Sequence, residues 1–235
     1  MYWLFYTPQW FNGWDIAFDL VGLLVTFLIA AYSWRIYGLN RENKFKYLSL
    51  AFLLVSLSLL VKAFSSSVLY YGGVREVIVT ALGPAVGPEL RFSEILYRSA
   101  FFAQMVTTLG AWLLIFFISQ KSRARLNKLY EVSQIGLFVY LIVLISVVAN
   151  FQYVVFYLTS VVLLALIVLN YYKNYLNTDG NSNAWRVLTS FMLIFFGNIL
   201  FIFVSLWDTL YVFGEVFTLG GYLLLLWTYH SIVSR

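Results

Sequence analysis

Six ionisable residues lie within or at the edges of long apolar stretches, and they are the best candidates for chemistry in this sequence. These residues are Asp15, Asp19, Lys62, Glu94, Arg98 and Glu215. A lone lysine or aspartate at the centre of a membrane-spanning helix is unfavourable by about 2.5–3.5 kcal/mol on insertion scales, so such groups pair with one another or line a wet cavity. Carboxylates and ammonium groups in that setting favour the binding of an ion or a small polar ligand.

The composition requires a membrane around these residues. The chain has 235 residues, of which 62% are hydrophobic and 11% are charged, whereas soluble domains carry about 25% charged residues. A soluble fold of this length cannot bury so much apolar surface. We therefore expect an all-α integral membrane protein whose partner is the lipid bilayer. The net charge of +5 comes from short basic loops, and we do not expect nucleic acid as a partner.

Residue usage argues against several kinds of catalysis. The chain has no cysteine and a single histidine, His230, which excludes disulfides, thiol nucleophiles and the usual zinc and haem ligand sets. We expect His230 and the serines of residues 65–67 at opposite membrane faces, so they cannot form a serine-protease pair. Asp15 and Asp19 share one helix, which is unlike a two-aspartate protease. We expect no enzyme activity and no cofactor.

Seven stretches are long and apolar enough to be spanning helices, which need about 20 residues each. Their approximate bounds are 14–37, 47–71, 94–119, 130–150, 152–172, 186–207 and 209–232. Only residues 150–152 separate the fourth stretch from the fifth, so six spans is the alternative count. Together the stretches predict a single transmembrane domain over residues 1–235.

Basic residues mark one side of the predicted bundle. Cytoplasmic loops carry an excess of lysine and arginine, and here the connections after the first and third spans carry them. These residues are Arg41, Lys44, Lys46, Lys121, Arg123 and Arg125. We therefore place the N-terminus outside and the C-terminus inside, and expect a multi-pass protein of the plasma membrane. The basic loops are the expected surface for a cytoplasmic or membrane signalling partner.

Residues 72–93 form the one long connection, on the outer side. Connections between helices in bundles are usually about 2–8 residues. The β-branched run VREVIVT, residues 74–80, predicts a short hairpin or an interfacial lid, with a flexible extracellular loop as the alternative.

Three pairs of similar segments predict an internal repeat. TLGAWLLI at 108–115 matches TLGGYLLL at 218–225 in five of eight positions. WRIYGLN at 34–40 corresponds to YKNYLNT at 172–178, and KYLSLAF at 46–52 corresponds to RVLTSFM at 186–192. The order of these matches indicates a 3+1+3 plan, with helices 1–3 and 5–7 in the same orientation. Parallel repeats of this kind occur in transporters.

This plan is similar to those of sugar-exporting seven-helix transporters and of microbial rhodopsins. However, the span 209–232 has no lysine that could hold retinal. The sugar exporters carry prolines within their triplets, whereas Pro8, Pro84 and Pro88 all lie outside the predicted spans. The chain shares the helix plan of these two families but lacks the lysine and the prolines that characterise them.

Polar residues follow one face of several predicted helices at spacings of three or four, so these faces should point into the bundle. On the first helix they are Asp15, Asp19, Gly22, Thr26, Ala30 and Ser33, and on the second they are Ser58, Lys62, Ser65 and Ser66. Later helices contribute Glu94, Arg98, Gln104, Thr108, Ala111, Asn198, Ser205, Glu215, Thr218, Tyr222 and Tyr229.

Depth in the membrane follows from the rise of 1.5 Å per residue. On this scale Asp19 and Glu215 lie about 9 Å from the outer end of their helices, and Lys62 lies about 14 Å in, near the midplane. Because a short loop joins the first two helices, Asp19 and Lys62 are the expected ion pair. Arg98 is expected to pair with Glu94 or Glu215. The charged groups therefore gather in the outer half.

Two functions fit this pattern. In the first, the protein is a receptor-like sensor that binds a small polar ligand or ion in an outward-facing cavity and signals through a partner. The expected ligand-binding residues are Asp19, Lys62, Ser58, Ser65, Arg98 and Glu215. In the second, it is a small transporter built from the two repeats. The alternatives to a site are that the charged pairs only join the helices, or that Lys62 extends to an interface.

Overall fold

The computed structural model describes residues 7–86, 89–120, 153–179 and 181–233, and all regular structure in these ranges is helical. A short 3-10 turn, Gln9–Phe11, precedes the α-helices. Their bounds are α1 Trp14–Asn40, α2 Asn43–Tyr70, α3 Gly72–Val86, α4 Glu89–Ser119, α6 Tyr153–Asn177, α7 Ser182–Ile202 and α8 Thr209–Val233. The fourth predicted span, 130–150, lies outside the described residues, so the count of seven spans stays a prediction.

Six of the described helices are long and apolar enough to cross a membrane. They are Trp14–Asn40, Asn43–Tyr70, Arg98–Ser119, Tyr153–Asn177, Ser182–Ile202 and Thr209–Ile232. The chain is therefore a multi-pass membrane protein, as the composition predicts. Each of these spans overlaps one of the predicted stretches.

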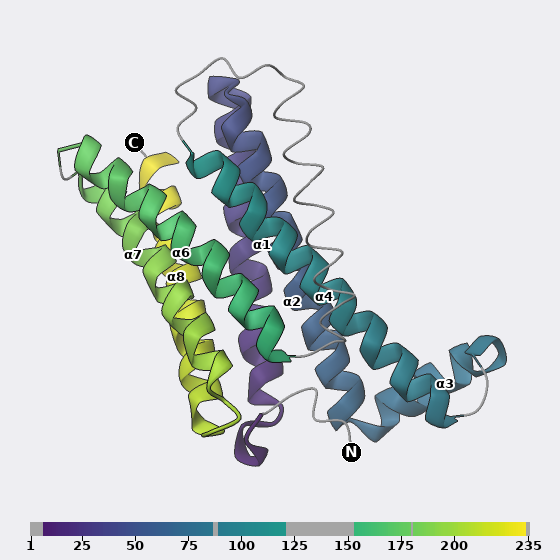
Figure 1. Ribbon diagram of the computed structural model, residues 1–235. Helices are drawn as coiled ribbons and strands as arrows, with labels where there is room; N and C mark the ends of the chain where they lie inside the picture. The colour runs from purple at the N-terminus through teal and green to yellow at the C-terminus, as the bar shows by residue number, and fades with distance from the viewer. Residues whose placement is uncertain (1–6, 87–88, 121–152, 180, 234–235) are drawn as a thin grey trace.

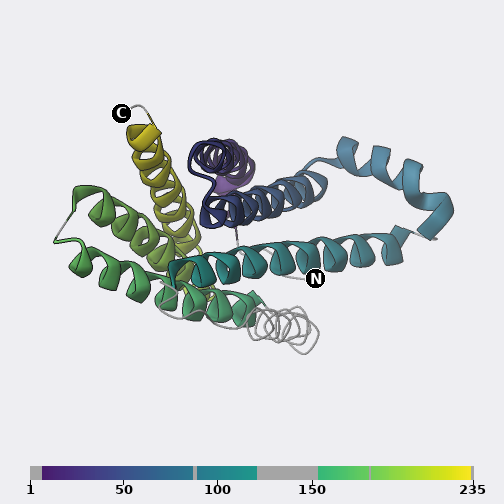
Figure 2. The same ribbon diagram turned by 90° about the horizontal axis from the view of Figure 1, so that it is seen from above.

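The six spanning helices form a ring (Figures 1 and 2). Along the ring α1 packs on α2, α2 on α4, α4 on α6, α6 on α7 and α7 on α8, and α8 returns to α1. Helices α1, α4, α6 and α8 run in one direction, and α2 and α7 run in the opposite direction. We call the lower end in Figure 1, where α1 begins, the amino end of the bundle. The upper end, where α8 ends, is the carboxyl end.

Local sequence determines where these helices begin and end. α1 ends at Asn40, and the next residue, Arg41, caps it: Arg41 adopts the left-handed conformation (φ 55°) and donates its backbone N–H to the Tyr37 carbonyl at 2.8 Å. This cap turns the chain directly into α2. At the start of α7 the Asn181 side chain accepts from the Asn183 N–H at 2.9 Å, as an N-cap does. α7 ends at Ile202, earlier than the predicted residue 207.

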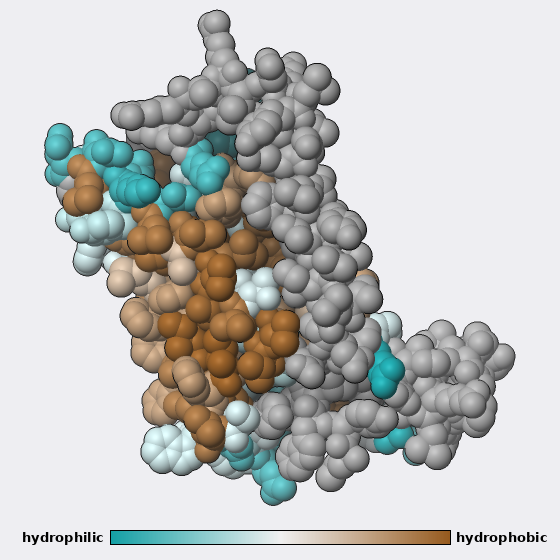
Figure 3. All heavy atoms as spheres, viewed as in Figure 1, coloured by the Kyte–Doolittle hydropathy of each residue, from teal (hydrophilic) through white to brown (hydrophobic). Residues whose placement is uncertain are grey.

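Apolar side chains cover the outside of the bundle as well as its interior. Leu24, Phe27 and Leu158 are among the large hydrophobic residues that remain exposed, as expected for a surface that faces lipid. In the coloured part of Figure 3 hydrophobic residues fill the middle, and hydrophilic residues gather toward its two ends. The interior contains two clusters. A larger cluster centred on Ile29, Phe52, Ile115, Leu164 and Ile194 fills the part toward the carboxyl end, and a smaller aromatic cluster lies toward the amino end.

The connection after α2 corrects the sequence interpretation. Gly72–Val86 is helix α3 and not a hairpin or an extended loop, and it leads away from the ring (Figures 1 and 2). The apolar residues at positions 74, 77, 78, 81 and 82 follow the helical spacing of three and four, and this spacing outweighs the strand preference of the β-branched residues. The hydroxyl of Thr80 donates to the Glu76 carbonyl one turn earlier, at 2.8 Å.

Candidate functional site

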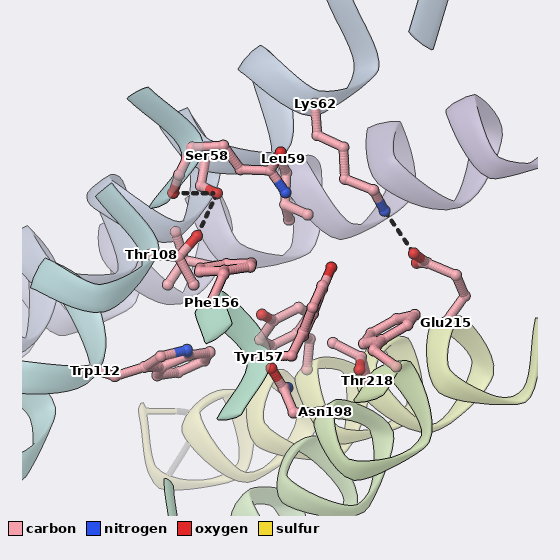
Figure 4. A pocket seen from close by; sticks show the side chains of 14 residues that line it. Ser58, Leu59, Lys62, Thr108, Trp112, Phe156, Tyr157, Asn198, Glu215 and Thr218 are labelled. Carbon is pink, nitrogen blue, oxygen red and sulfur yellow. Dashed lines mark hydrogen bonds and ion pairs between the residues drawn. The ribbon is translucent and has the colours of Figure 1, made fainter. Parts of the chain in front are cut away.

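Three charged side chains from three helices meet inside the ring. The ammonium group of Lys62 on α2 lies 2.8 Å from an oxygen of Asp19 on α1 and 2.5 Å from an oxygen of Glu215 on α8. The exposed fractions of Lys62, Asp19 and Glu215 are 5%, 1% and 6%. Figure 4 shows the lysine reaching across to Glu215. We call these three residues the charged cluster.

The polar faces of α1 and α2 bring this cluster together. Every residue of the predicted stripe on α1 is buried, from Asp15 to Ser33. On α2 the residues Ser58, Lys62, Ser65 and Ser66 are buried as well. The two helices are also joined by the hydroxyl of Ser49, which donates to the Ala30 carbonyl at 2.8 Å. The predicted Asp19–Lys62 pair is confirmed, and Glu215 pairs with Lys62 and not with Arg98.

The formal charges of the cluster do not balance. Two carboxylates face one ammonium group, and Asp15 lies one turn further along α1 toward the amino end. Oδ2 of Asp19 has no hydrogen-bond partner among the described residues. The ring of Tyr211 lies 5.5 Å from the Lys62 nitrogen, close enough for a cation–π contact. A buried excess of negative charge is costly unless something neutralises it.

A cavity of about 60 Å³ lies beside Glu215 and Lys62 (Figure 4). On this measure one buried water needs about 10–15 Å³, so the cavity has room for a few water molecules or a small ion. Sites for larger organic ligands usually have about 300–1,000 Å³. The residues that line the cavity are Val55, Ser58, Leu59, Lys62, Gln104, Thr108, Trp112, Phe156, Tyr157, Asn198, Phe201, Glu215, Thr218 and Tyr222.

Part of the polar wall of this cavity is satisfied by protein groups and part is not. The hydroxyls of Ser58 and Thr108 lie 2.5 Å apart, and the hydroxyl of Ser160 donates to Asn198 Oδ1 at 2.9 Å. In contrast, the indole N–H of Trp112 and the hydroxyl of Thr218 have no hydrogen-bond partner within the described part of the chain. Unsatisfied polar groups on a cavity wall are the usual places for ordered water.

The two sides of the charged cluster differ in packing. Toward the amino end, the ring of Phe11 packs on the rings of Phe18 and Tyr211, and the ring of Tyr211 lies next to Lys62. The hydroxyl of Tyr70 donates to Asp15 at 3.0 Å and ties α2 to the start of α1. Toward the carboxyl end the larger apolar cluster fills several turns of all six helices.

The structure separates the six predicted site residues into two groups. Asp19, Lys62 and Glu215 form the charged cluster, and Ser58 lines the cavity next to it. Ser65 is buried but donates to the Val61 carbonyl of its own helix, at 2.7 Å, and does not line the cavity. Arg98 lies on an exposed part of α4, away from the cavity wall. The side chain of Glu94 lies outside the described residues.

Sequence reasoning placed several cavity residues on bundle-facing polar sides without assigning them to the site. They are Gln104, Thr108, Asn198, Thr218 and Tyr222, and all of them line the cavity. It missed Trp112, Tyr157 and Tyr211, because aromatic residues are abundant in this chain and carry no spacing signal of their own. Ser205, predicted on the polar face of the sixth span, is exposed beyond the end of α7.

The Asn198–Ser160 hydrogen bond gives a local prediction. Hydrogen bonds between membrane helices contribute about 0.6 kcal/mol on average and at most about 1.7 kcal/mol. Asn198→Leu should therefore lower the free energy of unfolding by this amount, measured by denaturant unfolding in detergent. Adding Ser160→Ala to Asn198→Leu should have little further effect, because the bond is already lost. If the losses of stability in Asn198→Leu and Ser160→Ala added up fully in the double variant, the contact would be contradicted.

No protein-family model, curated protein or solved structure matches this chain. The functional argument therefore depends on the geometry of the charged cluster and its cavity.

Proposed function

We propose that this protein is a membrane sensor that binds a small ion or a very small polar ligand at the charged cluster, and that it signals through a partner. The observation that carries this proposal is the meeting of Lys62, Asp19 and Glu215 from three helices beside a cavity. Ionisable residues inside a membrane bundle are functional candidates by default because their burial is costly. Because the cavity is small, its ligand can contain only a few atoms.

The alternative is that these ion pairs only hold the helices together. Two features favour a site. The cluster has one carboxylate more than it has ammonium groups, and a carboxylate oxygen of Asp19 has no partner in the described residues. A purely structural cluster would be more stable if it held as many ammonium groups as carboxylates and if each carboxylate oxygen accepted a hydrogen bond. A space beside Glu215 and Lys62 is also unnecessary for holding helices together.

The signal would pass along α1 and α8. Both helices contribute to the cluster, and both extend to the carboxyl end of the bundle. There the hydroxyl of Tyr32 on α1 lies 3.2 Å from Nδ1 of His230 on α8. In the proposed orientation this end faces the cytoplasm of a cell whose plasma membrane holds the protein. Arg41, Lys44 and Lys46 lie there and would form part of the partner surface, whereas Lys121, Arg123 and Arg125 lie outside the described residues.

A second candidate function is transport, and one observation favours it. The alignment of residues 46–52 with 186–192, continued along the helix, pairs Ser58 with Asn198. The alignment of residues 108–115 with 218–225 pairs Thr108 with Thr218 and Trp112 with Tyr222. All six residues line the same cavity. The ring order fits this plan, because α1–α2–α4 would correspond to α6–α7–α8. Transporters with parallel repeats place their substrate sites at the interface between the repeats.

The charges break this approximate symmetry. In the same registers, the positions equivalent to Lys62 and Glu215 are occupied by Ile202 and Met105, which are apolar. One half of the cavity is therefore charged and the other is neutral. The packed apolar cluster toward the carboxyl end closes the cavity on that side. These two features favour one binding site at one side of the membrane, as a sensor needs, over a passage.

Accessibility of introduced cysteines separates the two functions. The chain has no cysteine of its own, so Thr26→Cys, Thr108→Cys and Tyr229→Cys can each be probed with a membrane-impermeant thiol reagent. A sensor predicts that none of the three is labelled from the cytoplasmic face under any ionic condition. Leu39→Cys, exposed at the carboxyl end of α1, is the positive control. Labelling of Thr108→Cys from that face that appears and disappears with conditions would support transport and contradict the sensor.

A further inference from the structure

We propose that the ion exchanged at the charged cluster is a proton, taken up by the carboxylate of Glu215. This inference rests on the proposed function and names the ligand of the same site. The starting point is the charge balance: Lys62 neutralises one of its two carboxylate partners, and one positive charge is still required. Uptake of one monovalent cation makes the cluster neutral.

Among the side chains that the structure describes, those that face Glu215 do not supply this charge. α1 contributes Asp19, with Asp15 one turn away, and α2 contributes Lys62. α6 contributes Tyr157, and α8 itself contributes Tyr222 and Tyr211. The only titratable residue of α7 is Arg186 in its first turns, at the carboxyl end of the bundle, where its guanidinium lies 4.6 Å from the ring of Trp227. On α4, whose side chains the structure describes from Arg98 onward, the only one is Arg98, which is exposed.

The cavity is poorly suited to a metal cation. Metal cations with oxygen ligands need several free oxygens converging on one point. Here the hydroxyls of Ser58 and Thr108 bond to each other, and the amide oxygen of Asn198 accepts from Ser160. The hydroxyl of Thr218 has no partner in the described part of the chain. Oδ2 of Asp19 also lacks a partner there, but Asp19 does not line the cavity. No group of three or more acidic, histidine or cysteine side chains that could hold a metal occurs among the described residues.

A proton needs no such set of ligands. It is delivered by water, and the cavity beside Glu215 has room for a few water molecules. The proton moves from a water molecule to a Glu215 carboxylate oxygen and forms an O–H bond; no other bond changes. The cluster then holds one neutral acid and the Lys62–Asp19 ion pair. Because the attraction between Glu215 and Lys62 is weakened, α8 is less tightly held to α1 and α2.

Infrared difference spectroscopy on the full chain in lipid nanodiscs tests this inference. Acidification should produce the carbonyl stretch of a protonated carboxylic acid that is shielded from bulk exchange. Glu215→Gln should remove this band. Glu76→Gln, which changes an exposed carboxylate on α3, is the matched control and should leave the band intact. A band that survives in Glu215→Gln, or no band in the parent, would overturn the inference.

A second experiment distinguishes a failure of this inference from a failure of the proposed function. At constant pH, sodium, potassium and ammonium chloride are titrated while tryptophan fluorescence is recorded, since Trp112 lines the cavity. We expect acidification to change the fluorescence of the parent and these salts to have no specific effect. A saturable response to one of these cations, without a carboxylic acid band, would overturn the proton and leave an ion sensor in place. No response to any of them would contradict both proposals.

Glu215→Gln itself has to be shown to fold. Size-exclusion profiles and far-ultraviolet circular dichroism should match those of the parent. The variant carrying Asp19→Asn, Lys62→Met and Glu215→Gln provides an additional test, because it removes all three charges together and leaves no buried charge unpaired. It should also lack the band, and a band retained in this variant would assign the proton to another group.

Discussion

Lys62→Met should lower the free energy of unfolding by about 3–5 kcal/mol, the cost of breaking a buried ion pair by removing one partner. Among the described residues, Lys62 is the only one whose ammonium group lies between Asp19 and Glu215, at 2.8 Å and 2.5 Å. Without it, two carboxylates remain buried next to each other. Methionine keeps the length and apolar character of the lysine stem, so the loss comes from the charge. Denaturant unfolding in detergent measures the effect.

Two further variants show that this loss belongs to the cluster. Lys44 is on the same helix and pairs with Glu42 at 2.6 Å, but the two side chains are 56% and 52% exposed. Exposed pairs contribute about 0–1 kcal/mol, so Lys44→Met should change stability little. Adding Asp19→Asn and Glu215→Gln to Lys62→Met should recover most of the lost stability. Equal effects of Lys62→Met and Lys44→Met would contradict the buried geometry.

Gly221→Ala should be the second severe change, because α7 and α8 approach closely at this position. A Cβ on Gly221 would lie 2.7 Å from the Ser190 carbonyl oxygen and 2.6 Å from a side-chain carbon of Ile194. The carbonyl belongs to the backbone of α7 and cannot move aside without shifting the helix. Overpacking of this kind costs about 1–3 kcal/mol, and small residues at such contacts are typical of membrane helix pairs.

The neighbouring glycine provides the control. A Cβ on Gly220 would meet nothing within 4 Å, and alanine is the better helix former by about 1 kcal/mol. Gly220→Ala should therefore be neutral or stabilising in the same unfolding measurement. If both variants lost the same stability, the close approach of α7 and α8 at Gly221 would be wrong.

The part of the site that sequence could predict is the part set by helical periodicity. The stripe from Asp15 to Ser33 repeats every three or four residues, so its burial and the meeting of Asp19 with Lys62 on the adjacent helix follow from the pattern. The partner of Glu215 could not be predicted in this way. It depends on α8 returning to α1 across the ring, and no local pattern specifies which distant helices become neighbours.

Two other differences have separate physical causes. The β-branched run at residues 74–80 predicts a hairpin, because valine, isoleucine and threonine favour strands. The spacing of the apolar residues is helical, and the structure has helix α3 there. Trp112 and Tyr157 line the cavity, but in a chain with 20% aromatic residues their type alone does not distinguish a cavity wall from a lipid-facing surface. The cavity itself depends on how side chains from several helices pack against one another, and the spacing of residues along one helix does not specify that packing.

The central claim is that ion uptake at the charged cluster moves α8 relative to α1. The most direct test is the distance between spin labels at Leu39→Cys and Ile232→Cys, exposed positions on these two helices near the carboxyl end. In the parent chain, the distance distribution should shift when the pH is lowered. In the variant with Asp19→Asn, Lys62→Met and Glu215→Gln it should stay the same at both pH values. A distribution that never shifts in the parent, or that shifts equally in the neutral variant, would contradict the claim and leave the cluster as a purely structural contact.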